Sequence, residues 1–461
     1  MTNRRKFLQQ GVVVFSTPRL IGTALSAGMF LPVAAASSKG SAKTVVIPTH
    51  EHFGDIEERL DFPASWDIHV QEMAGHNAPV LTRDEIRHRI QTPIASQPLR
   101  EIAAGKKSAV ITFDDCTRPT PTYDVAPVVV EELLAAGVPK DRIVFLCSYG
   151  THRPMERDEV VRKLGPEVIR QYPWINHQIW ENCKEVGTTS NKNRVEVDQT
   201  FAAADVRVTI SGIKVHASAG YGGGAKAVLP GVASFQTIQF NHSNLIDRKS
   251  IPDTIRIFDN GMRADMVESA KLAKVDFSVQ IVYNGRRKVC GIFAGDILDA
   301  HIAACRMAIK HYTTKKFPKP DIVVYNGYPQ TVQAGMGGDW IRSVRDGGTG
   351  LVILQNPQGL AAWHQGIEHS LGQNGRTYLD RLLTQPAPLR NDVQLIVYSQ
   401  YLDRQQMVKY PKSTIFASTW DEALRALQAR HKGDASVAVY PYGAIQHSEY
   451  LLDEPQSAAR G

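Results

Sequence analysis

The sequence has 461 residues, of which 43% are hydrophobic and 21% are charged. This composition is typical of a folded globular protein and excludes a disordered or fibrous chain, and the length exceeds what one ordinary core holds, so we expect two domains. The formal net charge of +7 falls to +3 without residues 1–36, which contain four basic residues and no acidic one. The remaining excess forms no basic run interleaved with aromatic side chains, so we expect no nucleic-acid partner.

The first 36 residues have the features of an export signal. Arg4 and Arg5 open a basic segment, a mildly apolar stretch follows, and three alanines end it at Ala36, a pattern typical of a twin-arginine signal peptide. Pro18 and Arg19 interrupt the apolar stretch, which leaves it short of the roughly 20 residues that span a bilayer. We therefore expect cleavage near residue 36, transient contact with the twin-arginine translocase, a periplasmic or otherwise exported location, and no stable membrane association.

Residues 37–43 form a polar linker, and a strand-like run begins at residue 44. Further on, an apolar strand at 109–113, a helix that ends at Gly137 and a strand at 143–147 form a β-α-β unit, which predicts a parallel sheet. A second unit includes a strand at 206–210 and a glycine-rich segment, and helices are expected at 265–274 and 296–311. We assign residues 44–312 to a first α/β domain.

A polar, proline-bearing segment at residues 313–320 is the expected domain boundary. Beyond it, buried strands alternate with helical segments, the last of them at 419–430; the expected strands are 322–325, 350–354, 393–398 and 436–439. We assign residues 321–461 to a second α/β domain. The predicted fold class is two α/β domains with parallel-type sheets and an active-site cleft between them.

The loop that follows the strand at 109–113 contains Asp115 and Arg118. Ligands of open α/β sheets bind at the carboxyl ends of strands. The guanidinium of Arg118 matches a carboxylate or a phosphate, and Asp115 either orients it or binds a ribose hydroxyl. Taken alone, the loop fits a strand-end salt bridge with prolines shaping a turn better than a ligand site.

Three further segments carry residues suited to chemistry. His152 follows the strand at 143–147 and so shares a sheet edge with Arg118, where a histidine suits proton transfer near neutral pH. His216 precedes a glycine-rich segment that contains Lys226, and alanines flank this lysine, which excludes a Walker loop and disfavours ATP hydrolysis. His242 by itself is equally consistent with a core histidine. Together these residues suit a metal or cofactor with acid–base work, and spacing alone goes no further.

The same segments resemble the nickel-dependent lactate racemase catalytic proteins, in their order and in the spacing from His216 to Lys226 to His242. The matching pieces are Asp115-x-Thr117-Arg118-Pro119, Gly150-x-His152-Arg153-Pro154, Leu229-Pro230-Gly231 and Asn241-His242. The resemblance implies a racemase or epimerase that inverts C2 of a small 2-hydroxy acid, and it implies that cofactor-synthesis proteins are transient partners.

The resemblance also implies a cofactor and roles for single residues. A nickel-pincer nucleotide, a pyridinium-3,5-bisthiocarboxylic acid mononucleotide, would be bonded covalently to Lys226 and its nickel coordinated by His242, with further cofactor contacts from Asp115, Thr117 and Arg118. His152 and His216 would alternate as base and acid, and Arg118 would also bind the substrate carboxylate. The cofactor would accept and return a hydride.

The second domain departs from the family pattern. Residues 326–329 resemble the segment that leads to a glutamine and a lysine at the substrate, but here Gln330 and Gln333 follow with no lysine. We expect these two glutamines to reach the cleft, and a 2-hydroxy acid larger than lactate or differently charged. Two alternatives remain open: a non-catalytic periplasmic solute-binding paralogue of the same fold, and a zinc hydrolase that uses His152, His216 and His242.

Overall fold

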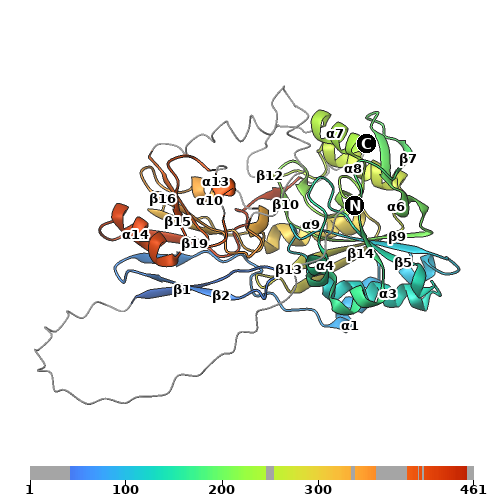
Figure 1. Cartoon of the computed structure of the whole chain (residues 1–461), viewed down its shortest axis with the longest axis horizontal. Helices are drawn as coiled ribbons and strands as arrows, with labels where there is room; N and C mark the ends of the chain where they lie inside the picture. The colour runs from blue at the N-terminus through green and yellow to red at the C-terminus, as the bar shows by residue number, and fades with distance from the viewer. Residues whose placement is uncertain are drawn as a thin grey trace, which may run out of the picture. The chain divides into compact units, whose positions relative to one another are not determined.

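Two six-stranded sheets dominate the part of the chain that the structure, a computed structural model, describes (Figure 1). The described residues are 42–245, 254–333, 338–359, 392–402, 404–407 and 410–453. The expected signal peptide at residues 1–36 lies outside them, so its function stays a prediction. Most neighbouring strands in the two sheets are parallel, which confirms the predicted α/β class with parallel-type sheets.

The first sheet has the strand order β14-β13-β9-β4-β5-β6, in which β14 runs antiparallel to β13 and the other pairs are parallel. Its strands in chain order are β4 (Ala109–Phe113), β5 (Ile143–Cys147), β6 (Trp174–Asn176), β9 (Val206–Gly212), β13 (Phe277–Tyr283) and β14 (Val289–Gly295). The predicted strands at 109–113 and 143–147 coincide with β4 and β5. Because β4 lies between β9 and β5, the loops that leave these three strands meet at one edge.

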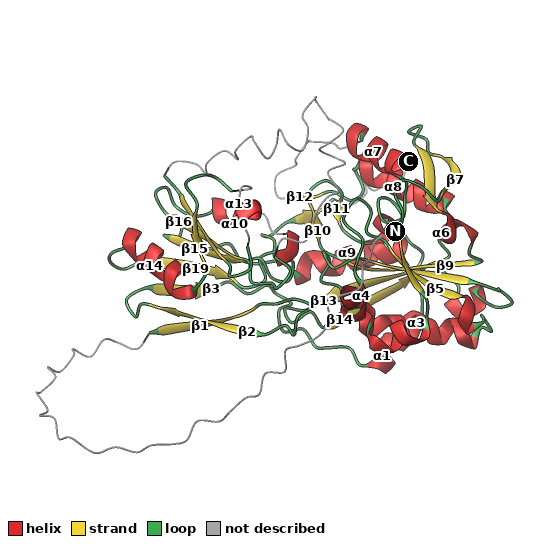
Figure 2. Cartoon of the chain, viewed as in Figure 1, coloured by secondary structure: helices red, strands yellow, loops and turns green. Residues whose placement is uncertain are grey.

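Helices cover both faces of this sheet, since side chains alternate between the faces along each strand. Ile111 packs with residues of α1, α3 and α9, whereas Val110 packs with residues of α7 and α8, and Figure 2 shows α1 and α3 opposite α7 and α8. The helices are α1 (Arg83–Gln91), α2 (Leu99–Ile102), α3 (Thr122–Ala135), α4 (Arg157–Leu164), α5 (Pro166–Gln171), α6 (Gln199–Ala203), α7 (Phe235–Asn244), α8 (Gly261–Leu272) and α9 (Asp299–His311). Among the described residues, no helix combines the length and apolar character needed to cross a membrane.

The second sheet is parallel throughout, in the order β18-β17-β16-β15-β19-β3. Its strands in chain order are β3 (Asp67–Val70), β15 (Ile322–Asn326), β16 (Thr349–Ile353), β17 (Gln394–Tyr398), β18 (Ile415–Ala417) and β19 (Ser436–Tyr440). The helices that follow β15 and later strands are α10 (Gly338–Arg342), α13 (Arg404–Met407) and α14 (Trp420–Arg430). The four strands and the helix expected after residue 320 are all present, with ends shifted by one or two residues.

Strands near both ends of the described chain pair or pack with elements that are distant from them in sequence. The hairpin of β1 (Lys43–Pro48) and β2 (Glu57–Phe62) packs on the second sheet, and β3 pairs with β19. Conversely, β20 (Leu451–Leu452) pairs with β12 (Thr254–Ile255), which precedes α8. The predicted division into 44–312 and 321–461 is therefore not followed by these terminal strands, and the position of the domain boundary stays a prediction.

Several small elements complete the described fold, and two of them hold or adjoin predicted site residues. A two-stranded β-ribbon of β7 (Cys183–Thr188) and β8 (Arg194–Asp198) lies beside α7 and α8. The hairpin of β10 (Val215–His216) and β11 (Gly220–Tyr221) leads into the short 3₁₀-helix η2 (Gly224–Ala227), which contains Lys226. A second short 3₁₀-helix, η3 (Thr331–Gln333), follows Gln330 after β15.

Candidate active site

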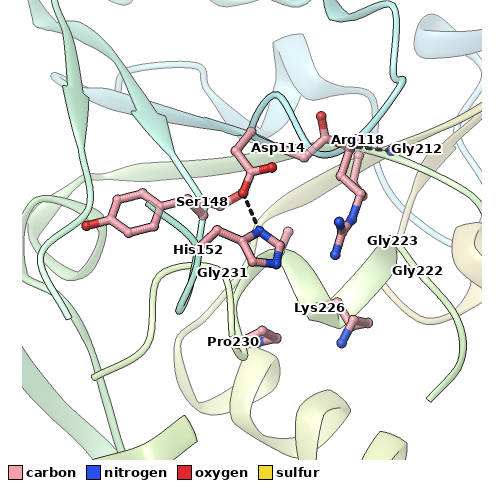
Figure 3. A pocket seen from close by; sticks show the side chains of 14 residues that line it. Asp114, Arg118, Ser148, His152, Gly212, Gly222, Gly223, Lys226, Pro230 and Gly231 are labelled. Carbon is pink, nitrogen blue, oxygen red and sulfur yellow. Dashed lines mark hydrogen bonds and ion pairs between the residues drawn. The ribbon is translucent and has the colours of Figure 1, made fainter. Parts of the chain in front are cut away.

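The loops after β4, β5 and β9 enclose a partly open pocket. Arg118, His152 and Lys226 line it together with glycines of the segment after β9, and Figure 3 shows their side chains around one space. The sequence prediction that Arg118 and His152 share a sheet edge is therefore correct, and Lys226 joins them.

His152 is held by a buried carboxylate. Its Nδ1 lies 2.6 Å from Oδ2 of Asp115, and Oδ1 of Asp115 accepts hydrogen bonds from the Thr117 amide at 2.8 Å and its hydroxyl at 2.6 Å. Burial by itself raises the pKa of Asp115, but the charge and hydrogen bond of His152, with help from Arg118 and Thr117, outweigh burial and hold it well below its usual value. An ionised Asp115 accepts the Nδ1 proton of His152, and this tautomer places the lone pair on Nε2.

A second Asp–His pair in the same lobe shows what a purely structural arrangement looks like. His177 contacts Asp198 through Nδ1 at 3.0 Å, and its Nε2 donates to the Ala233 carbonyl at 2.9 Å. Both ring nitrogens of this fully buried side chain are used by the protein. His152 differs because it lines the pocket.

The loop that carries Arg118 is fixed by a buried ion pair. Lys163 of α4 contacts Oδ1 of Asp114 at 2.6 Å and donates to the Arg118 carbonyl at 2.7 Å. The other oxygen of Asp114 accepts from the Gly212 amide at 3.1 Å, which ties this loop to the end of β9. The guanidinium of Arg118 donates to the Thr117 hydroxyl at 2.6 Å. Asp115, which we expected to orient Arg118 or a ribose, instead contacts His152 directly.

The glycine-rich segment is held from behind by two buried side chains. Arg263 of α8 donates to the carbonyls of Ala219 (2.8 Å), Gly223 (3.3 Å) and Tyr221. His301 of α9 contacts the Gly222 carbonyl at 3.0 Å and packs so closely on Gly224 that a Cβ there would lie 2.7 Å from its ring. Carbonyl groups engaged on this side fix the backbone whose other side lines the pocket. Nothing in the sequence pattern marked Arg263 or His301.

His216 is close enough to Lys226 to be affected by its charge, and its hydrogen bonds define its tautomer. Its Nδ1 accepts hydrogen bonds from the amides of Ser218 at 3.3 Å and Ala219 at 3.2 Å, so the ring proton resides on Nε2. The positive charge of Lys226 is the largest cause that lowers the pKa of His216 well below its usual value, followed by burial and by Arg118. His216 is therefore neutral at pH 7 in the unmodified chain.

His242 is a neutral histidine with one nitrogen committed to the protein. It lies on the last turn of α7, a helix whose first turn is capped by Ser234. Its Nδ1 contacts the Ile238 carbonyl at 3.1 Å, and burial followed by the charge of Lys226 lowers its pKa to about 3. A histidine that donates Nδ1–H to a main-chain carbonyl presents Nε2 as a ligand atom, an arrangement common at metal sites.

Gln330 reaches the loops of the first sheet, and its predicted role at the substrate stays a prediction. Its amide nitrogen donates to the Thr117 carbonyl at 2.6 Å, and its oxygen accepts from the ammonium group of Lys214. Lys214 was missed in the sequence analysis because a lysine two residues before a histidine has no distinguishing signal. The side chain of Gln333 lies outside the described residues, so its predicted role is untested.

Comparison with known proteins places this site in a family. Residues 53–252, which contain Asp115, His152, His216, Lys226 and His242, match the family described as lactate racemase N-terminal domain. A lactate racemase of Lactiplantibacillus plantarum is 27% identical over 398 residues, covering 81% of this chain and 92% of that protein. The region that holds the site thus matches a lactate racemase domain family, and the chain as a whole is similar to a lactate racemase over most of its length.

The chain is also similar to a second lactate racemase and to two solved structures. A lactate racemase of Thermoanaerobacterium thermosaccharolyticum is 27% identical over 285 residues, 60% of this chain and 66% of that protein. The solved lactate racemase apoprotein of the same organism shares the fold, with a TM-score of 0.62 at 22% identity, 89% of this chain and 100% of that one being covered. A Thermotoga maritima protein has a TM-score of 0.54 at 18% identity, with 83% and 99% covered.

Proposed function

We propose that this protein is a racemase or epimerase that inverts C2 of a small 2-hydroxy acid. The observation that carries the proposal is the pocket in which Asp115-anchored His152, the carboxylate-binding Arg118 and Lys226 converge, with His216 adjacent to Lys226. Similarity to lactate racemases supports the racemase class. A solute-binding protein would need the cation in this pocket, but it would have no need for a histidine that is held in one tautomer by a buried carboxylate.

The residues present fit the nickel-pincer nucleotide that the family resemblance implies. Lys226 offers an amine in the pocket, and neutral His242 offers Nε2 as a single metal ligand. Among the described residues, no three histidine, cysteine or acidic side chains form a metal-binding group, and the donor set at hand suits a metal whose other ligands belong to an organic group. Glycines at the pocket wall permit close approach of a phosphate. When bound, the cofactor would accept and return a hydride.

The chain's own side chains would bind the substrate and move its hydroxyl proton. Arg118 binds the carboxylate through its guanidinium fork. His152 accepts the hydroxyl proton at Nε2, because Asp115 holds the other nitrogen protonated and stabilises the imidazolium that results. His216 presents Nε2–H, which donates a hydrogen bond to the substrate oxygen. A covalent bond from the cofactor to Lys226 would remove the charge that most lowers the pKa of His216, and it would therefore raise that pKa.

The test is the mass and metal content of the intact chain, and it needs no knowledge of the substrate. The chain is co-expressed with pincer-synthesis proteins and purified without oxygen. We expect added mass on the Lys226 peptide and about one nickel per chain, and we expect both to be lost in Lys226→Ala and retained in Lys310→Ala, which changes an exposed lysine. An unmodified wild-type chain, obtained where a known family member is loaded, would contradict the proposal and favour a solute-binding protein.

We also propose that residues 1–36 direct export through the twin-arginine translocase. The paired arginines and the terminal alanines support this location. Fractionation of cells followed by N-terminal sequencing should find a chain that starts near residue 37 in the periplasm, and Arg4→Lys together with Arg5→Lys should retain it inside. A full-length chain that accumulates only in the cytoplasm would contradict export.

A further inference from the structure

Lys214 occupies a junction between three loops of the site. It follows β9, its side chain is half-buried, and its ammonium group donates to Oε1 of Gln330. The amide of Gln330 in turn donates to the carbonyl of Thr117, the residue before Arg118. The carbonyl of Lys214 accepts from the Gly222 amide at 2.7 Å, and Gly222 lines the pocket. A single lysine thus connects the loops after β9, β4 and β15.

The charge of Lys214 has no carboxylate partner within the part of the chain that the structure describes. Among the described residues, no carboxylate lies within ion-pair distance of its ammonium group, and its polar partner is a neutral amide. The two acids of the pocket are already used, since Asp114 pairs with Lys163 and Asp115 with His152. Burial, followed by the positive charge of Arg118, lowers the pKa of Lys214 to about 7. Two cations near each other in a poorly solvated site favour an anionic ligand.

We propose that Lys214 is a substrate-binding residue that holds the carboxylate of the 2-hydroxy acid together with Arg118, while Gln330 positions its ammonium group. This inference takes the 2-hydroxy acid from the proposed function, and it adds that Lys214 selects for the carboxylate of that acid. Lys214 is a cation with three rotatable donors, close enough to Arg118 for the two charges to act on each other, and it would contact carboxylate oxygens that the planar fork of Arg118 leaves open. Anionic 2-hydroxy and 2-keto acids would be selected over neutral hydroxyketones.

Binding to the full chain made without the cofactor-synthesis proteins tests this inference separately from catalysis. Pyruvate, lactate and malate are titrated calorimetrically. Lys214→Met should raise the Kd of the acid that binds the wild type by about tenfold to a hundredfold, since a hydrogen bond to a charged group is worth about 1.5–3 kcal/mol. Lys214→Arg should retain most of the affinity, and Lys310→Met, which removes an exposed lysine, should leave Kd unchanged.

Two further measurements separate binding from a structural role. Repeating the titration at pH 8 in buffers of different ionisation enthalpy should show uptake of close to one proton by the wild type and none by Lys214→Met, because the bound anion restores the charge of Lys214. Gln330→Glu keeps a side chain that bridges the loops but gives Lys214 a permanent counter-charge. It should weaken carboxylate binding at least as much as Lys214→Met does.

The inference is overturned by unchanged affinity in Lys214→Met, by unchanged affinity in Gln330→Glu, or by a wild type that binds none of the three acids. Lys214→Gln serves in place of Lys214→Met if the latter fails to fold. Loss of nickel or of inversion in an otherwise normal acid-binding chain would refute the proposed function and leave the role of Lys214 intact.

Discussion

Replacement of Asp115 by asparagine tests the function of His152 with almost no change in shape. The asparagine oxygen can keep the hydrogen bonds from the amide and hydroxyl of Thr117, which now reach Oδ1 at 2.8 and 2.6 Å. The amide nitrogen then occupies the place of Oδ2, 2.6 Å from Nδ1 of His152. Because two donors cannot face each other, His152 must move its proton to Nε2, and the nitrogen that faces the pocket changes from acceptor to donor.

The size of the effect follows from the contact that is lost. A hydrogen bond to a charged group is worth about 1.5–3 kcal/mol, which sets a lower limit of about tenfold to a hundredfold in rate. Loss of a positioned general base costs about 10²–10⁴-fold. We therefore expect Asp115→Asn to reduce the rate of C2 inversion by about 10²–10⁴ in both directions, since His152 serves each direction as either base or acid.

Two assays measure the change. Nitrogen-15 NMR of the histidine rings in the unloaded chain reports the tautomer directly, and the loaded enzyme reports the inversion rate of each enantiomer. The matched control is Asp198→Asn, which alters the buried pair with His177 and should lower stability while leaving the rate per folded molecule near that of the wild type. A tenfold or smaller loss in Asp115→Asn, or an unchanged His152 tautomer, would refute the role assigned to this pair.

Two further predictions concern the glycine-rich segment. Arg263→Met leaves three carbonyl groups without their buried donor, at a cost of about 1–3 kcal/mol each. It also removes a cation whose burial is unfavourable, since burial lowers its pKa to about 10. Urea denaturation should therefore show a net loss of about 2–5 kcal/mol in the free energy of unfolding, and a loss below about 1 kcal/mol would contradict this account. Lys226→Met should raise the pKa of His216 in an NMR titration. In the wild type this lowered pKa means that the unfolded chain binds the extra proton, so stability falls as pH falls below about 6.5, and the variant should lose less stability between pH 6.5 and 5; an unshifted pKa would show that Lys226 does not act on His216.

The sequence was sufficient to place the site because its chemistry follows the ends of parallel strands. The strands at 109–113 and 143–147 were recognisable as apolar runs of the right length, and adjacent parallel strands bring Arg118 and His152 to one edge whatever the details of packing. The positions of His216, Lys226 and His242 came from a motif whose spacing is fixed by a short hairpin and a helix. These are local features, which a sequence records directly.

The contacts that the sequence did not reveal join residues that are far apart along the chain. Lys214 contacts Gln330 across 116 positions, and Arg263 donates to carbonyls that lie 40 to 44 positions earlier. The same holds for β3, which pairs with β19 although the two are separated by almost the whole described chain. No periodicity or spacing encodes such pairs, because they depend on how the sheets pack. Asp115 was assigned two possible partners for the same reason, and the structure gives a third, His152.

The charges around the pocket explain why these distant contacts matter for the choice of ligand. Asp114 and Asp115 are each bound to a basic side chain of the protein, and among the described residues neither forms an ion pair with Lys214. A neutral solute would not compensate the charge of Lys214, whereas a carboxylate compensates it and restores its proton. Selectivity for anionic acids would thus arise because Asp114 and Asp115 are bound to Lys163 and His152 and do not form an ion pair with Lys214. The affinity of such acids should fall as pH rises above about 7, because binding must then also supply the proton that Lys214 has lost.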